Sequence, residues 1–284
     1  MQFCKPKIFV LGEVIVDKTE IHNYLVHLGA EKWYQENVED SEVSDTEILS
    51  EVYSRGCYKS FGEGLNPNIK QVREGNDIHL KNVIESQHGS ILEHSVINFM
   101  FCDVSRVFTH ELVRHRVGVA ISQESLRYVR LTELKCFDFP RLKDELTEGE
   151  EEWFRLRVKE VFTYLEDIQR DMTIKFKLDD EKSFAKKKKL TSRMRRLAPL
   201  GLLTNIGWSA NLRTLRHVIP LRTHKSAEEE IRLVFAEVGS MCKRKFPNIF
   251  FDMEWYSDID NNRVSSGGEM IGEMGEWRIA NRKV

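Results

Sequence analysis

APLGLLTNIGWSANLRTLRHVIPLR, residues 198–222, predicts a loop, a strand and then a short helix, and this alternation sets the fold class. Asn211 stands where the helix would begin, and its side chain can accept a hydrogen bond from a free backbone N–H of the first turn. The apolar residues that follow at helical spacing predict the buried stripe: Leu212, Leu215, Val218 and Ile219. The segment therefore predicts a strand that leads directly into a helix packed on the same core.

The flanking segments add further strands and helices. Residues 7–16 and 91–101 are rich in β-branched and aromatic side chains, which is typical of strands. Residues 103–116 carry apolar side chains at helical spacing. Residues 146–190 are charged with a helical period, and we expect their lysine run, 186–189, to be a solvated end.

The C-terminal third predicts one more helix and a tail. Ser226 with Glu229 forms a capping-box pattern that predicts a helix start, and Pro247 would end that helix. From Asp258 the chain is rich in Asn, Ser and Gly. We therefore predict a single domain, 1–257, followed by a weakly ordered tail, 258–284.

Two segments contain arginine but no lysine, although lysine is plentiful elsewhere. One lies between Asp103 and Leu134 and includes RHRVGVAISQESLRYVR, 114–130; the other lies between Thr191 and His224. A solvated surface would mix the two residue types, whereas arginine alone favours bidentate binding of phosphates and carboxylates. The first segment also supplies amide and hydroxyl donors and a tyrosine ring, a set that suits a nucleotide. A structural network of ion pairs is the alternative.

Composition limits the classes of protein. The 284 residues include 43 Lys and Arg against 45 Asp and Glu, a net charge of −2, so phosphate binding would be local and general nucleic-acid binding is not expected. The five cysteines lie far apart without a CxxC motif, which argues against a disulfide framework and predicts a reducing cytoplasm. No apolar run approaches the roughly 20 residues of a membrane helix, so no membrane partner is expected.

Other catalytic motifs are weak or missing. HELVRH, 110–115, resembles a zinc-protease motif, but His110 and His115 are five residues apart, about 140° around a helix, and cannot easily share a metal. We therefore expect no metal site. The sequence has no GxSxG around a serine and no phosphate-binding P-loop, which disfavours a Ser125 triad and ATP-driven chemistry.

Four separated motifs, taken together and in order, resemble those of the flavin-dependent thymidylate synthases over roughly residues 58–240. The motifs are HGSILEH at 88–94, RHR at 114–116 followed by SQESLRY at 122–128, RRLAPL at 195–200 and NLRTLRHVIPLR at 211–222. The resemblance implies an α/β (α+β) fold with a mixed sheet and flanking helices. It also implies a homotetramer whose active sites are built from several subunits.

The resemblance implies two sets of ligand residues by position. The residues that would hold FAD are His88, Ser90, Arg114, His115, Arg116, Gln123, Asn211, Arg213 and His217. The residues that would hold dUMP are Glu111, Arg114, Ser125, Leu126 through its backbone, Arg127, Arg195 and Arg222.

Two departures from the family pattern stand out. The spacer between Arg116 and Ser125 is one residue longer than the family's usual seven, and position 111 is Glu where many members have Gln. A carboxylate beside a phosphate needs a neutralising cation, so we expect Glu111 to pair with Arg114 or Arg195.

The implied reaction converts dUMP to dTMP with methylenetetrahydrofolate as carbon donor and NADPH as the reductant of FAD. No cysteine lies in either arginine segment, which fits hydride delivery from flavin better than thiolate attack on uracil. The resemblance makes Arg222 the catalytic residue, whose fixed charge would stabilise negative charge on the pyrimidine. Two alternatives stay open: a related flavin and folate enzyme that makes another product such as 5-hydroxymethyl-dUMP, and a non-catalytic nucleotide- or RNA-binding protein.

Overall fold

The computed structural model describes residues 1–62, 65, 67–69, 71–128, 131, 133–140, 142–258, 263–264 and 274–280. Its strands are β1 (Gln2–Cys4), β2 (Lys7–Gly12), β3 (Val96–Ser105), β4 (Val119–Gln123), β5 (Lys135–Phe137), β6 (Leu203–Asn211), β7 (Met253–Ser257), β8 (Arg263–Val264) and β9 (Gly275–Ile279). Its α-helices are α1 (Lys18–His27), α2 (Glu31–Tyr34), α3 (Asp45–Tyr58), α4 (Asn76–Glu85), α5 (Arg106–Leu112), α6 (Leu142–Glu145), α7 (Glu148–Lys175), α8 (Phe184–Met194), α9 (Leu212–Thr223) and α10 (Glu229–Lys245). A π-helical turn, η1 (Gln35–Glu39), and two 3₁₀ turns, η2 (Gly89–Glu93) and η3 (Arg195–Leu197), complete the elements.

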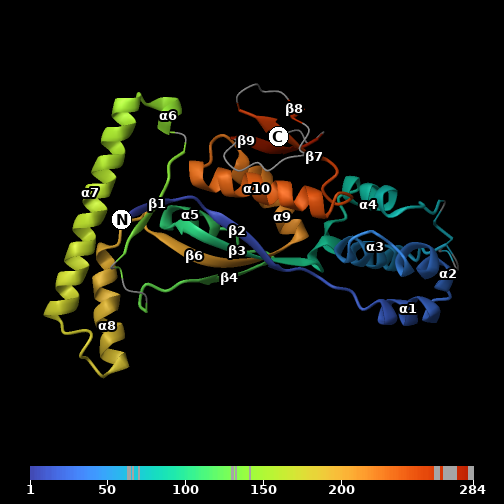
Figure 1. Ribbon diagram of the computed structural model, residues 1–284. Coiled ribbons are helices and arrows are strands. Elements are labelled where there is room, and N and C mark those ends of the chain that lie inside the picture. The colour runs from blue at the N-terminus through green and yellow to red at the C-terminus, as the bar shows by residue number, and fades with distance from the viewer. Residues whose placement is uncertain are drawn as a thin grey trace.

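A four-stranded sheet in the order β2-β3-β6-β4 forms the centre, and each neighbouring pair is antiparallel. Figure 1 shows α5, α9 and α10 against this sheet, α7 and α8 together at one end, and α1 to α4 at the other. The parallel pair β1–β5 and the antiparallel set β8-β7-β9 form two smaller sheets. The expected α/β class with flanking helices is confirmed, with parallel and antiparallel pairing in different sheets.

The core lies between the central sheet and its helices. Ile97, Phe99 and Phe101 of β3 are buried while Asn98 between them is exposed, because successive side chains of a strand point to opposite faces. α10 meets this face with a stripe of buried residues at helical spacing: Ile231, Phe235, Val238 and Cys242. No helix in the described ranges is long and apolar enough to cross a membrane.

Some predicted boundaries move by a few residues. The strand predicted over 91–101 begins only at Val96, because residues 89–93 form a 3₁₀ turn, and β3 continues to Ser105, which pairs with Leu203 of β6. The helix predicted from residue 103 therefore begins at Arg106, where the Ser105 Oγ accepts from the Phe108 N–H at 3.2 Å. Pairing with a distant strand decides this boundary, and apolar periodicity carries no information about that partner.

The predicted capping box at Ser226 is wrong, although the helix ends before Pro247 as expected. The N-cap of α10 is Glu228, whose carboxylate accepts from the Glu230 N–H at 2.8 Å. Ser226 instead pairs its hydroxyl with the His224 Nδ1 at 2.8 Å. The pattern was correct about a helix start but two residues early.

Part of the expected tail is packed against the domain. β9 pairs with β7, and Trp277 is 1% exposed, with its indole N–H donating to the Ala236 carbonyl at 2.9 Å. Gly239 makes this approach feasible, because a Cβ there would lie 2.3 Å from the Trp277 Nε1. The division at residue 258 stays a prediction, and residues 259–262, 265–273 and 281–284 lie outside the described residues.

Candidate active site

Four predicted dUMP ligands, Ser125, Leu126, Arg127 and Arg195, line one cavity of about 350 Å³. We call this cavity the arginine pocket. Its wall consists of Arg106, Gln123, Glu124, Ser125, Leu126, Arg127 and Arg195. Arg106, Arg127 and Arg195 form no ion pair with another described residue. The wall holds three guanidinium groups and one carboxylate, that of Glu124, so its charge is suited to an anion.

Elements far apart in the chain build this pocket. β4 ends at Gln123, which pairs with Ile206 of β6, and the chain then turns so that the Arg127 N–H donates to the Ser125 Oγ at 3.3 Å. Arg195 also lines the pocket, and it is the first residue of η3. β4 pairs with β6 along its length in a continuous register, so the extra spacer residue makes no bulge in the strand.

The lysine run of α8 contacts the turn after Ser125. The Lys188 ammonium lies 5.1 Å from the Tyr128 ring centroid, and the Phe184 ring stacks on Tyr128 at 6.0 Å. A hydrogen bond from Lys188 lowers the pKa of the Tyr128 hydroxyl. Lys188 of the run expected to be solvated is half-buried and contacts Tyr128, whereas Lys186 and Lys189 are exposed.

Arg106 and Glu124 line the pocket but were absent from the predicted set. The Arg106 NH2 donates to the Glu124 carbonyl at 3.4 Å, while the Glu124 carboxylate accepts from the Asn205 N–H at 3.3 Å. Burial lowers the pKa of Arg106; the Glu124 carboxylate opposes this shift, and the nearby Arg195 adds to it. Arg106 lies in the lysine-free segment, so the arginine bias was the signal that could have found it.

A second cluster surrounds Arg222 at the end of α9. Its NH1 donates to the Glu111 carboxylate at 2.5 Å, its NH2 to the Glu111 carbonyl at 3.0 Å and its Nε to the His115 Nε2 at 2.7 Å. Burial, then Arg222 and His217, lower the pKa of His115 to about 4. His115 is therefore neutral at pH 7 and serves as an acceptor. The expected partners of Glu111, Arg114 and Arg195, were wrong, because the partner is Arg222.

The remaining predicted FAD residues lie around the start of α9 and the loops beside it. The Asn211 side chain accepts from the Thr214 N–H at 2.9 Å, which confirms the predicted N-cap. Gly118, at φ +69°, packs so closely that a Cβ would meet the Asn211 Nδ2 at 2.3 Å. Arg213 pairs with Glu93, and the His88 Nδ1 is 2.8 Å from the Tyr58 hydroxyl.

Four further predicted FAD residues have exposed side chains. Arg114 and Arg116 are exposed and have no ion pair with another described residue, and Ser90 and His217 are exposed as well. Gln123 is the exception among the predicted FAD residues, because it lines the arginine pocket.

One protomer does not gather both predicted ligand sets into one pocket. Val119, beside Ala210, and Gln123, beside Ile206, mark the two ends of β4. At about 3.4 Å per residue, these ends are roughly 14 Å apart. The start of α9 adjoins the first end, and the arginine pocket adjoins the second.

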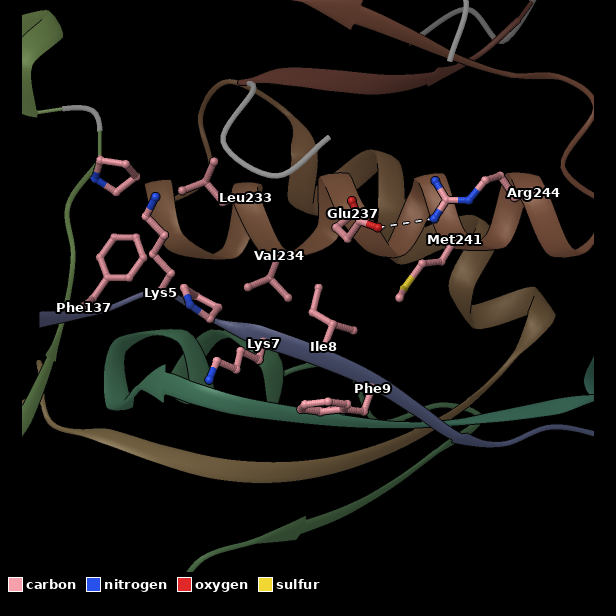
Figure 2. A pocket seen from close by; sticks show the side chains of 12 residues that line it. Lys5, Lys7, Ile8, Phe9, Phe137, Leu233, Val234, Glu237, Met241 and Arg244 are labelled. Carbon is pink, nitrogen blue, oxygen red and sulfur yellow. Dashed lines mark hydrogen bonds and ion pairs between the residues drawn. The ribbon is translucent and has the colours of Figure 1, made fainter. Parts of the chain in front are cut away.

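A larger cavity of about 460 Å³ lies between α10 and the edge strand β2. Figure 2 shows its mostly apolar lining, which includes Ile8, Val234 and Met241, with Glu237 and Arg244 paired on α10. None of the predicted site residues lines it. The arginine pocket, although smaller, is therefore the better candidate for nucleotide chemistry.

Neither a reactive thiolate nor a metal-binding cluster is found among the described residues. Burial raises the pKa of Cys136 to about 12 and also raises the pKa values of Cys4, Cys102 and Cys242, which disfavours their thiolates. Among the described residues, no three His, Cys, Asp or Glu side chains are placed to hold a metal ion.

The structure is an α/β protein with an arginine-lined cavity that suits an anion, and comparison with known proteins shows its family. The family described as "Thymidylate synthase complementing protein" matches residues 41–248. The flavin-dependent thymidylate synthase of Corynebacterium diphtheriae is 31% identical over 215 residues, 76% of this chain and 82% of its own. That of Corynebacterium glutamicum is 31% identical over 231 residues, 80% and 87% of the two chains. That of Mycobacterium tuberculosis is 30% identical over 224 residues, 77% and 84%.

The chain therefore belongs to the thymidylate synthase complementing protein family, the family of the flavin-dependent thymidylate synthases. The resemblance inferred from the four motifs is confirmed.

Proposed function

We propose that this protein converts dUMP to dTMP, with methylenetetrahydrofolate as carbon donor and NADPH-reduced FAD as hydride source. The observation that carries the proposal is the arginine pocket, in which Ser125, Leu126 and Arg127 meet Arg195 from a distant segment. These are the positions at which the family pattern puts the dUMP ligands. Guanidinium groups beside a serine hydroxyl suit a phosphate monoester.

The residues near the start of α9 fit FAD. Arg213 packs on the Gly89 backbone, since a Cβ on Gly89 would lie 3.0 Å from the Arg213 Nε. Arg114 and Arg116 are exposed guanidinium groups that precede Val117, whose carbonyl accepts from the Thr214 hydroxyl in α9 at 2.7 Å, and such groups favour a pyrophosphate. His88, Ser90, Asn211 and His217 would complete this cofactor site. When bound, reduced FAD would supply the hydride.

Arg222 supplies fixed positive charge in this proposal. Its guanidinium is held at three nitrogens by Glu111 and His115, and neutral His115 adds no competing charge. A preorganised cation of this kind stabilises negative charge that develops on a bound pyrimidine without a reorganisation cost. Glu111 would orient Arg222 and stand beside the substrate.

We also propose that the active site is completed in a cytoplasmic homotetramer. The roughly 14 Å between the two ends of β4 separates the start of α9 from the arginine pocket within one protomer. A second copy could place its cofactor residues beside the arginine pocket. Trp153, Tyr164 and Ile174 on α7 are 61%, 66% and 75% exposed, and large exposed apolar side chains along one helix offer an association surface.

The test is an absorbance spectrum of the purified protein, followed by turnover. A flavin spectrum that NADPH bleaches, and a dUMP product heavier by one CH₂, would support the proposal. A product heavier by CH₂O would indicate hydroxymethylation instead. A colourless protein that binds nucleotide but gives no product would overturn the enzymatic proposal.

A further inference from the structure

The last turn of α9, which carries Arg222, follows a proline. Pro220 lies inside the helix and has no N–H, so the backbone bond that residue 220 would donate to the Arg216 carbonyl is missing. A helix interrupted in this way loses part of the ladder that holds its final turn. The backbone of Arg222 and Thr223 therefore needs support from outside the helix if the guanidinium is to keep one orientation.

The C-terminal segment supplies that support at Thr223. Thr223 is fully buried, and its hydroxyl donates to the Ile219 carbonyl at 2.9 Å and accepts from the Trp277 N–H of β9 at 2.9 Å. The Thr223 carbonyl accepts from the Arg232 Nε at 3.1 Å, and the Arg232 NH2 donates to the Gly275 carbonyl, at the start of β9, at 3.3 Å. Trp277 and Arg232 are 1% and 7% exposed, so water does not weaken these bonds.

The same segment also holds α9 on the other side of Pro220. Arg216 donates from NH1 and NH2 to the two carboxylate oxygens of Asp252, just before β7, at 2.8 and 2.7 Å. β7 and β9 pair with each other, so one small sheet holds the helix both before and after the proline. This sheet follows the matched residues 41–248, so its hold on α9 lies outside the region that the family model describes.

We infer that Thr223 and Trp277 are positioning residues for Arg222. By fixing the last turn of α9, their bond holds the Arg222 guanidinium where Glu111 and His115 can orient it. This inference rests on the proposed function, because that function assigns Arg222 to the reaction. A displacement of about 1 Å at a reacting centre can lower a rate about 10²-fold. An anchor one residue from Arg222 therefore acts mainly on kcat.

The experiment compares Thr223→Val, which keeps the shape but removes the hydroxyl, with Thr223→Ser, which keeps the hydroxyl. We expect Thr223→Val to lower kcat for dTMP formation about 10- to 100-fold, with KM for dUMP within about threefold of native and FAD occupancy unchanged. Thr223→Ser should recover most of the rate, because it restores both hydrogen bonds of the hydroxyl. Thr173→Val is the matched control, since the buried Thr173 hydroxyl of α7 donates to the Gln169 carbonyl in the same way, at 2.9 Å.

A double-mutant cycle with Arg222→Ala separates positioning from a general structural role. In the Arg222→Ala background, Thr223→Val should cause no further loss of kcat, because both changes remove the same function. An equal fold-loss in both backgrounds would overturn the inference, and so would a native kcat in Thr223→Val. Should Thr223→Val fail to fold, Trp277→Phe takes its place in the cycle with the same expected outcomes. Trp277→Phe keeps an aromatic ring but loses the indole bond to the Ala236 carbonyl that seats β9.

Hydrogen exchange of the backbone amides separates this inference from the proposed function. In Thr223→Val the amides of residues 221–224 should exchange faster than in native protein, while those of residues 212–219 should not change. If native protein makes no dTMP but this local change is seen, the anchoring of the Arg222 turn stands and the proposed reaction is wrong. If native protein makes dTMP and exchange at residues 221–224 is unchanged in Thr223→Val, the positioning inference is wrong and the proposed function stands.

Discussion

Arg222 and Glu111 form a bidentate contact in which the guanidinium reaches both the carboxylate and the main-chain carbonyl of Glu111. The two residues are 111 positions apart in the chain, at the ends of α9 and α5. The side chains of Arg222 and Glu111 are 16% and 30% exposed, so the pair remains accessible to a ligand. This contact holds the proposed catalytic cation in one orientation.

Arg222→Ala should leave the fold and the flavin content intact and lower the turnover rate by about 10²- to 10³-fold, about 2.7–4 kcal/mol, if it acts like a lost oxyanion donor. The measurement is single-turnover product formation with FAD occupancy recorded in parallel. A variant that turns over at the native rate would remove Arg222 from the mechanism.

Glu111→Gln should keep dUMP affinity within about tenfold of native or improve it, because the amide retains an acceptor oxygen for Arg222 and removes a negative charge worth about 1 kcal/mol at 4 Å in water. Glu111→Ala should impair the enzyme more than Glu111→Gln does, mainly by lowering kcat, because it removes the carboxylate that orients the Arg222 guanidinium. Kd for dUMP and kcat, measured at two salt concentrations, check this. Equal losses of affinity in both variants would show that the charge itself is required.

Arg116→Ala and Arg213→Ala should each lower FAD occupancy, since both would remove a guanidinium from the pyrophosphate. Flavin absorbance per protein at several added FAD concentrations measures the effect. Arg157→Ala, on the exposed surface of α7, serves as the control. Full occupancy in both variants would contradict the proposed cofactor site.

Glu230 should make stability fall as pH rises. Burial raises its pKa to about 7, and its carboxyl accepts from the Ser105 N–H at 2.6 Å and from the Ser105 hydroxyl. Because the folded pKa exceeds the unfolded value, the folded state binds more protons between about pH 4.5 and 7. The stabilisation is complete below that window and is lost as pH rises through it. Glu230→Gln should flatten this dependence, as urea unfolding at a series of pH values would show. An unchanged slope would mean that Glu230 does not titrate in this window.

The α7 surface should control assembly. Trp153 and Tyr164 are three helical turns apart on one side, opposite the buried Phe162. Trp153→Ser combined with Tyr164→Ser should reduce the mass measured by light scattering, whereas Lys159→Ser on the same helix should not. A tetramer that persists in the double variant would place the interface elsewhere.

The sequence by itself determined the family, several local structures and the residue type that lines the arginine pocket. The lysine-free segments correctly marked the arginines of the pocket, and Asn211 marked the start of α9, because a cap depends on residues within one turn. The order of four motifs indicated the family, which the comparisons confirm. These features are readable because they depend on residue type and short spacing.

Only the tertiary structure decided which residues meet. Arg106 shares a cavity with Glu124 and Arg195, whereas Arg222 lies outside that cavity and pairs with Glu111. These contacts arise because the register of β6 between β3 and β4 fixes where α5 and α9 begin. That register depends on burying Phe99, Phe101 and Trp208 against α10, a long-range packing choice that local spacing does not encode. The same packing puts the start of α9 and the arginine pocket at opposite ends of β4, since a strand keeps its ends apart by its length.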